Sequence, residues 1–212
     1  MRPKIEFDAE KHIYRVNGEV VPSVSEILEP LTAKHYGEIN ELTLRLAAER
    51  GTAVHEACEE LDYGLEPEVL TEYTGYVDAY IAFLQDYRPE WYGIEQMVYN
   101  PQEGYCGTID RWGVLRGIAG EQKAIVDIKT TTTPTKANYI TGACQLRMYG
   151  LALLRNGELE ATVKSWRYLL YLKKDGKYRL LDMAEWSEKH DLDAMRLTDA
   201  LIMANKLTNK VK

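Results

Sequence analysis

The stretch YCGTIDRWGVLRGIAGEQKAIVDIK, residues 105–129, decides the fold. Residues 105–115 and 123–129 are rich in β-branched and aromatic side chains, which favour strands. Between them, the run Gly117-Ile118-Ala119-Gly120 can adopt the backbone angles of a turn, because glycine tolerates positive φ. The stretch therefore predicts two adjacent antiparallel strands joined by a short loop.

Three ionisable side chains lie on these two strands. Paired residues of a hairpin are equidistant from its turn centre, and Asp110 and Asp127 are equidistant from a point inside the glycine-bounded turn. We therefore expect the two carboxylates to face each other, about 5 Å apart at Cβ. Lys129 follows Asp127 by two residues and shares its face, whereas Val126 and Ile128 point to the opposite side, toward the core.

Two carboxylates and a lysine on an apolar sheet are costly to bury without a function. A hard divalent cation would compensate the two close carboxylates, because such ions prefer oxygen ligands. The alternative is a surface salt bridge between Asp127 and Lys129. We favour the functional interpretation, because these residues end the apolar run Ala124-Ile125-Val126 and meet a second carboxylate through the turn.

Hydrophobic periodicity and turn residues predict the elements on either side of this hairpin. Upstream, we expect an N-terminal hairpin around Asn17-Gly18, a short helix from Ser23 to near Pro30, helices over residues 39–61 (interrupted at Gly51) and 67–87, and a strand over residues 91–99. Downstream, we expect a helix over residues 136–155, strands over residues 163–173 and 177–182, and a final helix over residues 184–207. This order predicts the α/β class, with a central mixed β-sheet flanked by helices and a helical N-terminal region.

The composition is that of an ordinary soluble globular protein, with 45% hydrophobic and 28% charged residues. The net charge of -7 argues against a non-specific DNA-coating protein, which would be basic. No apolar run is long enough to span a membrane, and the N-terminus has no apolar signal-peptide core, so we expect a cytoplasmic protein. The three cysteines are far apart in the sequence, so they indicate neither a zinc knuckle nor a disulfide framework.

Four short motifs together resemble a known family. Gly107-Thr108-Ile109-Asp110 and Ile125-Val126-Asp127-Ile128-Lys129-Thr130 resemble motifs II and III of the PD-(D/E)XK nucleases. The upstream Gly51-Thr52-Ala53-Val54-His55 and the downstream Gln145-Leu146-Arg147-Met148-Tyr149 resemble further motifs of the RecB-type branch of that superfamily. Residues 7–14 and 22–28 resemble the start of its phage and prophage exonucleases, a branch that also includes the mitochondrial genome maintenance exonuclease.

This resemblance implies a restriction-endonuclease-like fold. Residues 1–212 would form a single nuclease domain, in which residues 1–30 are the N-terminal hairpin and short helix and residues 90–175 are the catalytic core. The last 50 or so residues resemble nothing that we can name.

The resemblance also implies roles for the motif residues. Asp110, Asp127 and Lys129 would be catalytic, and a magnesium or manganese ion would be bound by Asp110, Asp127, the Ile128 carbonyl and His55. Relatives often have a glutamate in the preceding strand that contributes to the metal site, so Glu95 is a further catalytic candidate. That residue is as consistent with a solvent-facing strand carboxylate as with a catalytic one.

DNA is the implied partner, either single-stranded or at its ends. Gln145 and Tyr149 lie four residues apart and so share a helix face; we expect them, with Thr130 and Arg111, to contact the DNA. We expect no iron–sulfur cluster, because relatives that carry one use four cysteines. A homo-oligomer or a phage recombination partner is compatible with the resemblance.

The implied activity is metal-dependent hydrolysis of DNA. We rank an exonuclease of phage or prophage recombination, replication or repair first, because the relatives that this sequence resembles digest DNA from ends. A structure-specific or restriction-type endonuclease on the same fold is the first alternative. A nucleic-acid-binding module without catalytic activity is the second.

Overall fold

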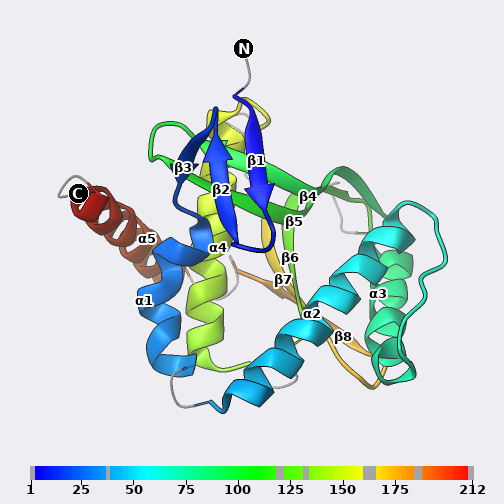
Figure 1. The fold of residues 1–212 in the computed structure, drawn as a ribbon. Helices are drawn as coiled ribbons and strands as arrows, with labels where there is room; N and C mark the ends of the chain where they lie inside the picture. Colours follow the sequence, from blue (N-terminus) through cyan, green and yellow to red (C-terminus); the bar gives the residue numbers. More distant parts are fainter. Residues whose placement is uncertain are drawn as a thin grey trace.

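The computed structural model describes residues 3–36, 39–117, 122–130, 134–159, 166–183 and 188–209. Its centre is a five-stranded sheet of β4 (Pro89–Asn100), β5 (Tyr105–Leu115), β6 (Gln122–Lys129), β7 (Trp166–Leu172) and β8 (Tyr178–Asp182), in that order. Neighbouring strands are antiparallel except β6 and β7, which are parallel. Helices flank this sheet (Figure 1), so the predicted α/β class with a central mixed sheet is confirmed.

The described helices are α1 (Val24–Tyr36), α2 (Glu41–Asp62), α3 (Thr74–Tyr87), α4 (Lys136–Arg155) and α5 (Glu188–Asn209). Capping boxes fix the starts of α1 and α4. Ser23 Oγ accepts a hydrogen bond from Glu26 N, and the Glu26 carboxylate accepts one from Ser23 N. Thr135 and Asn138 form the same kind of box at the start of α4, which covers the predicted residues 136–155.

Three predicted helix features are wrong. α1 continues through Pro30, because the proline removes only one hydrogen bond while Leu31 beyond it still packs on the core. α2 runs unbroken through Gly51, since one glycine costs a helix only about 1 kcal/mol. α3 begins at Thr74 after a 3-10 turn, because residues 67–70 bury too little apolar surface to hold a helical turn in place.

Other predicted stretches lie outside the described residues. These are residues 163–165 of the strand that became β7, residues 184–187 of the last helix and residues 118–121 of the β5–β6 turn.

Two apolar cores cover the two faces of the sheet. Along β6, Ile125 belongs to the core that includes α1, α4 and α5 residues. Ala124, Val126 and Ile128 belong to the core that includes α2 and α3 residues. This alternation confirms the predicted facing of Val126 and Ile128, and it places Asp127 on the α4 side of the sheet.

A small N-terminal sheet consists of β1 (Ile5–Asp8), β2 (Ile13–Val16) and β3 (Glu19–Val21). The predicted hairpin is confirmed, with positive φ at Asn17 and Gly18. The strand β1 was not predicted. Tyr14 on β2 is hydrogen-bonded to Thr108 on β5 at 2.8 Å, which fixes this sheet over the central one (Figure 1).

Candidate metal centre and active site

Three carboxylates occupy neighbouring positions on β4, β5 and β6. Arg111 shows the register, because it pairs with Ile94 on β4 and with Val126 on β6. By the same register, Asp110 on β5 lies between Glu95 on β4 and Asp127 on β6. The predicted register between β5 and β6 is therefore confirmed.

Glu95 has an unusual backbone conformation. Its φ is 45°, in the left-handed region that residues other than glycine seldom adopt. The register of β4 also shifts between Trp91 and Gly93, and such bulges often redirect side chains near functional sites. The Glu95 carboxylate contacts His55 and Arg111, so the solvent-facing alternative does not describe it.

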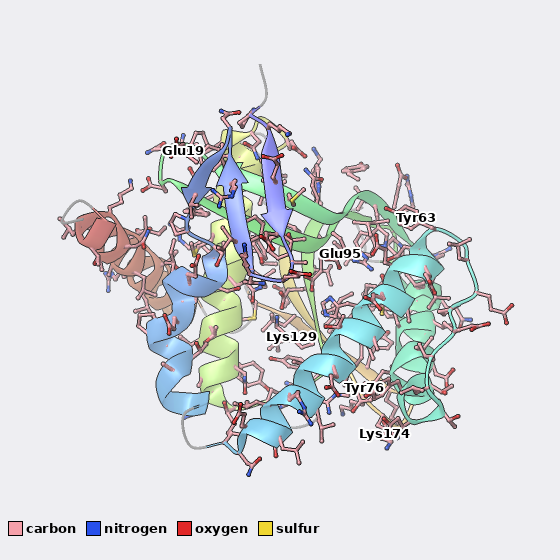
Figure 2. All side chains as sticks on the ribbon, viewed as in Figure 1. Glu19, Tyr63, Tyr76, Glu95, Lys129 and Lys174 are labelled. Atoms are coloured by element: carbon pink, nitrogen blue, oxygen red, sulfur yellow. The ribbon has the colours of Figure 1, made fainter. Side chains whose placement is uncertain are left out.

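His55 on α2 completes a compact group with two of these carboxylates. Its Nδ1 lies 3.6 Å from Glu95 Oε1 and 3.9 Å from Asp110 Oδ2, and its Nε2 lies 3.1 Å from the Ile128 carbonyl oxygen. One ligand atom each from His55, Glu95 and Asp110 lie within 4.8 Å of one another. Figure 2 shows Glu95 and Lys129 in the region between α2 and α4.

These residues fit a divalent metal ion. Both carboxylate oxygens of Asp127 are buried and lack a hydrogen bond within the described part of the chain, although Oδ2 lies 2.7 Å from Lys129 Nζ. Carboxylates with one imidazole are a donor set that suits magnesium and, more strongly, manganese. The geometry groups Glu95 with His55 and Asp110 and leaves Asp127 beside that group.

The electrostatics of the site depend on burial and on its dense charge. Burial opposes charge on His55, but Asp110 and Glu95 together outweigh it and raise the pKa of the imidazole. Burial likewise opposes charge on Glu95, yet His55 and Arg111 lower the pKa of that carboxyl. Burial raises the pKa of Asp127, an effect that Lys129 only partly offsets.

Lys129 links the carboxylates to α4. Its Nζ lies 2.7 Å from Asp127 Oδ2 and donates to Gln145 Oε1 at 3.4 Å. Gln145 Nε2 in turn donates to the Tyr149 hydroxyl at 3.1 Å. Tyr149 is only 4% exposed, so its position suits orienting Gln145 better than the predicted contact with DNA.

Arg111 and Thr130, both predicted to contact DNA, lie in different surroundings. Arg111 is fully buried and ion-paired with Asp62 and Glu95, which argues against the predicted DNA contact. Thr130 is largely buried but receives a hydrogen bond from Arg50 Nε at 3.4 Å. Its predicted contact with DNA stays a prediction.

Sequence reasoning missed Asp62, which ends α2 and pairs with Arg111 at 2.5 Å. The carboxylate lies 49 residues before its partner, and no local pattern connects the two. No signal in the sequence indicated that Arg50 approaches Thr130 and the Tyr76 ring, whose centroid lies 5.7 Å from the guanidinium.

Two hollows open near the end of β6. One, of about 330 Å³, lies between α1 and α4, and Lys129 and Gln145 line it together with Ser25, Thr32, Asn138 and Thr141. The other, of about 270 Å³, is lined by Arg50, Tyr73, Tyr76 and Lys174, and also by Glu72 and Leu46. Cations beside aromatic rings or hydroxyl groups are a lining that suits phosphates and bases.

Comparisons with known proteins give only distant similarities. No protein-family model matches the sequence, and no curated protein matches it. Among solved structures, an alkaline exonuclease (LHK-Exo) from Laribacter hongkongensis is 13% identical, with a TM-score of 0.35 over 89% of this chain and 92% of that one. The same enzyme in complex with dAMP is 12% identical, with a TM-score of 0.34 over 90% and 93%. Values this low establish no family.

Within the described ranges, no helix combines the length and the apolar character that a membrane span requires.

Proposed function

We propose that this chain is a divalent-metal-dependent DNA nuclease of the PD-(D/E)XK type. The observation that carries the proposal is the group of three carboxylates, one histidine and one lysine that three neighbouring strands and a helix bring together. The resemblance of the sequence motifs supports the same conclusion independently of this geometry. The catalytic core would lie within residues 90–175 of a single domain spanning residues 1–212.

The carboxylates and His55 would bind the metal ion, and Lys129 would stabilise negative charge on the phosphate. A magnesium or manganese ion bound by His55, Glu95, Asp110 and Asp127 would lower the pKa of a bound water and offset charge on the scissile phosphate. The Ile128 carbonyl stays a proposed fifth ligand, and its oxygen lies 3.1 Å from His55 Nε2.

Lys129 supplies a positive charge next to the carboxylates. A third of its side chain is exposed, so its ammonium can approach a phosphate oxygen that enters from solvent. Charge on that oxygen grows as the phosphodiester bond breaks, and a positioned cation stabilises it. Gln145 holds the lysine on the side facing α4.

The substrate would approach along the two hollows near the end of β6. Gln145 and Thr130 are the proposed DNA contacts, and Arg50 is a further cation beside Thr130. An exonuclease is our first choice because the phage and prophage exonucleases that the sequence resembles digest from ends.

The test is digestion of end-labelled linear DNA, single- and double-stranded, beside closed circular DNA. Each substrate is incubated with manganese, magnesium or EDTA, with the wild-type and the Lys129→Ala proteins in parallel. We expect the wild-type protein to digest linear DNA in the presence of metal and to leave circular DNA intact. The Lys129→Ala protein should digest neither. Cutting of circles would favour the endonuclease alternative, and metal-independent binding without cutting would favour the non-catalytic one.

A further inference from the structure

Arg111 is the largest of the fully buried side chains, and it joins the metal centre to the interior. Its Nε donates to Asp62 Oδ2 at 2.5 Å, and its NH1 donates to Glu95 Oε1 at 2.9 Å. The same NH1 also donates to the Asp110 carbonyl oxygen at 2.6 Å. One guanidinium therefore contacts the carboxylates of Glu95 and Asp62 and the backbone carbonyl oxygen of Asp110.

Asp62 is fixed from three directions. Besides Arg111, the Tyr80 hydroxyl donates to it at 2.8 Å and Trp91 Nε1 donates to it at 2.9 Å. These partners come from α3, β4 and β5, and the Asp62 side chain is 1% exposed. The carboxylate has little room to move, so the guanidinium that it binds is also held in one place.

Stability alone does not account for this pair. Replacing a buried ion pair by apolar residues of similar volume is often neutral or stabilising, because both charges lose their hydration. Arg111 NH2 has no hydrogen-bond partner within the described ranges, so the interior does not fully satisfy the guanidinium. The arrangement of the pair is explained instead by the contact that Arg111 NH1 makes with Glu95.

That contact is with the oxygen of Glu95 that faces the metal centre. Oε1 is the same atom that lies 3.6 Å from His55 Nδ1. Glu95 also has a left-handed backbone, and a residue in such a conformation keeps it only where its surroundings hold it. Arg111 supplies that restraint at the end of the side chain.

We propose that Asp62 and Arg111 are a positioning pair, which holds the Glu95 carboxylate toward His55 and Asp110 so that the site is preformed for a metal ion. This inference rests on the proposed metal-dependent function. Asp62 neutralises the charge of Arg111, so the negative charge of Glu95 stays available to bind the metal ion. Neither Asp62 nor Arg111 touches the metal or the DNA.

The test is a double-mutant cycle on Mn²⁺ affinity, measured by calorimetry with the full-length protein. The pair is removed by Asp62→Asn with Arg111→Met, which leaves no unpaired buried charge, and Glu95→Gln removes the group that the pair positions. We expect each change alone to weaken Mn²⁺ binding about 10- to 100-fold, as the loss of groups that orient ligands does. In the Glu95→Gln background, removal of the pair should add less than about a threefold loss, because the two changes act through one carboxylate.

A matched control removes the exposed pair of Glu90 and Arg116, which joins β4 to the residue after β5. Its removal by Glu90→Gln with Arg116→Met should leave Mn²⁺ affinity unchanged. Melting in EDTA checks that each variant folds. If the pair variant does not fold, Asp62→Asn alone, which keeps the shape, should still weaken Mn²⁺ binding.

The outcomes separate the inference from the proposed function. A folded pair variant, or a folded Asp62→Asn, that binds Mn²⁺ like the wild type overturns the positioning role. An equal loss in the wild-type and Glu95→Gln backgrounds overturns it too, because the effect would bypass Glu95. A wild-type protein that binds no Mn²⁺ instead overturns the proposed function, and the positioning role with it.

Discussion

His55 is the one nitrogen donor in a group of carboxylates, so its contribution can be isolated. Replacing it by glutamine should weaken Mn²⁺ binding by at least about 10-fold. The loss for Mg²⁺ should be smaller, because imidazole favours manganese. Calorimetric titrations with the two ions measure the difference. Glu56→Gln, at the exposed neighbouring position, is the control and should change neither affinity. If His55→Gln bound both ions as tightly as the wild type, His55 would be excluded as a ligand.

The pKa directions at His55 and Asp127 predict proton release when a metal binds. Both pKa values are raised in the metal-free protein, so protons occupy these groups to higher pH than usual. A metal needs the deprotonated forms, so its affinity should fall as the pH drops through those raised values. Calorimetry in buffers of different ionisation enthalpy counts the protons. A binding constant that does not vary between about pH 8 and about pH 6 would contradict the predicted linkage.

At the scale of single residues, the sequence located the groups that follow a local rule. Strand alternation and the symmetry of a turn were enough to bring Asp110, Asp127 and Lys129 together. The burial of Arg111 could not be predicted, because it depends on a partner, Asp62, that lies far away in the sequence. The sequence shows which residues are charged, but the tertiary packing determines whether a charged side chain is exposed to solvent.

At the scale of elements, Gly107 shows how closely β5 approaches α4. A Cβ added there would lie 2.7 Å from Tyr149 Cε1 and 3.0 Å from Val24 Cγ2. Gly107→Ala should therefore displace Tyr149, and with it Gln145, and lower the free energy of unfolding by about 1–3 kcal/mol. Urea unfolding measures this change.

Gly51 is the matched comparison in the middle of α2, where a Cβ would meet nothing within 4 Å. Gly51→Ala should raise the free energy of unfolding by about 0.5–1 kcal/mol, because alanine is the better helix former. If both substitutions were equally destabilising, close packing at Gly107 would not be the cause of its effect.

The elements themselves were largely predictable, and the errors have a common cause. The bounds of β5 and α4 agree with the predicted ones, because long periodic patterns and clear turn residues mark them. The wrong features were a proline and a glycine that tertiary packing tolerates, and a helix start that depends on how much surface residues 67–70 bury. Local signals do not contain that information.

At the scale of the whole molecule, the candidate metal centre brings together residues that are distant in the sequence. His55 comes from α2, Glu95 from β4 and Asp110 from β5, so a bound ion would join a helix to two strands of the central sheet. Mn²⁺ at about 100 times its dissociation constant should then raise the melting temperature by about 5–10 °C. Thermal melts with Mn²⁺ and with EDTA measure this shift, and identical melting temperatures would argue against a site that spans these elements.

The most direct test of the central claim is the rate of single-turnover cleavage of an end-labelled linear DNA strand as Mn²⁺ is titrated, for wild type and Asp110→Asn. Asparagine keeps the shape of the side chain and can still accept the hydrogen bond that Ile128 N donates to Asp110. The wild-type rate should saturate at the Mn²⁺ concentrations that saturate binding, and Asp110→Asn should lose at least about 100-fold in rate. Wild-type cleavage in EDTA, or an Asp110→Asn protein that cleaves at the wild-type rate, would contradict a metal-dependent nuclease centred on this site.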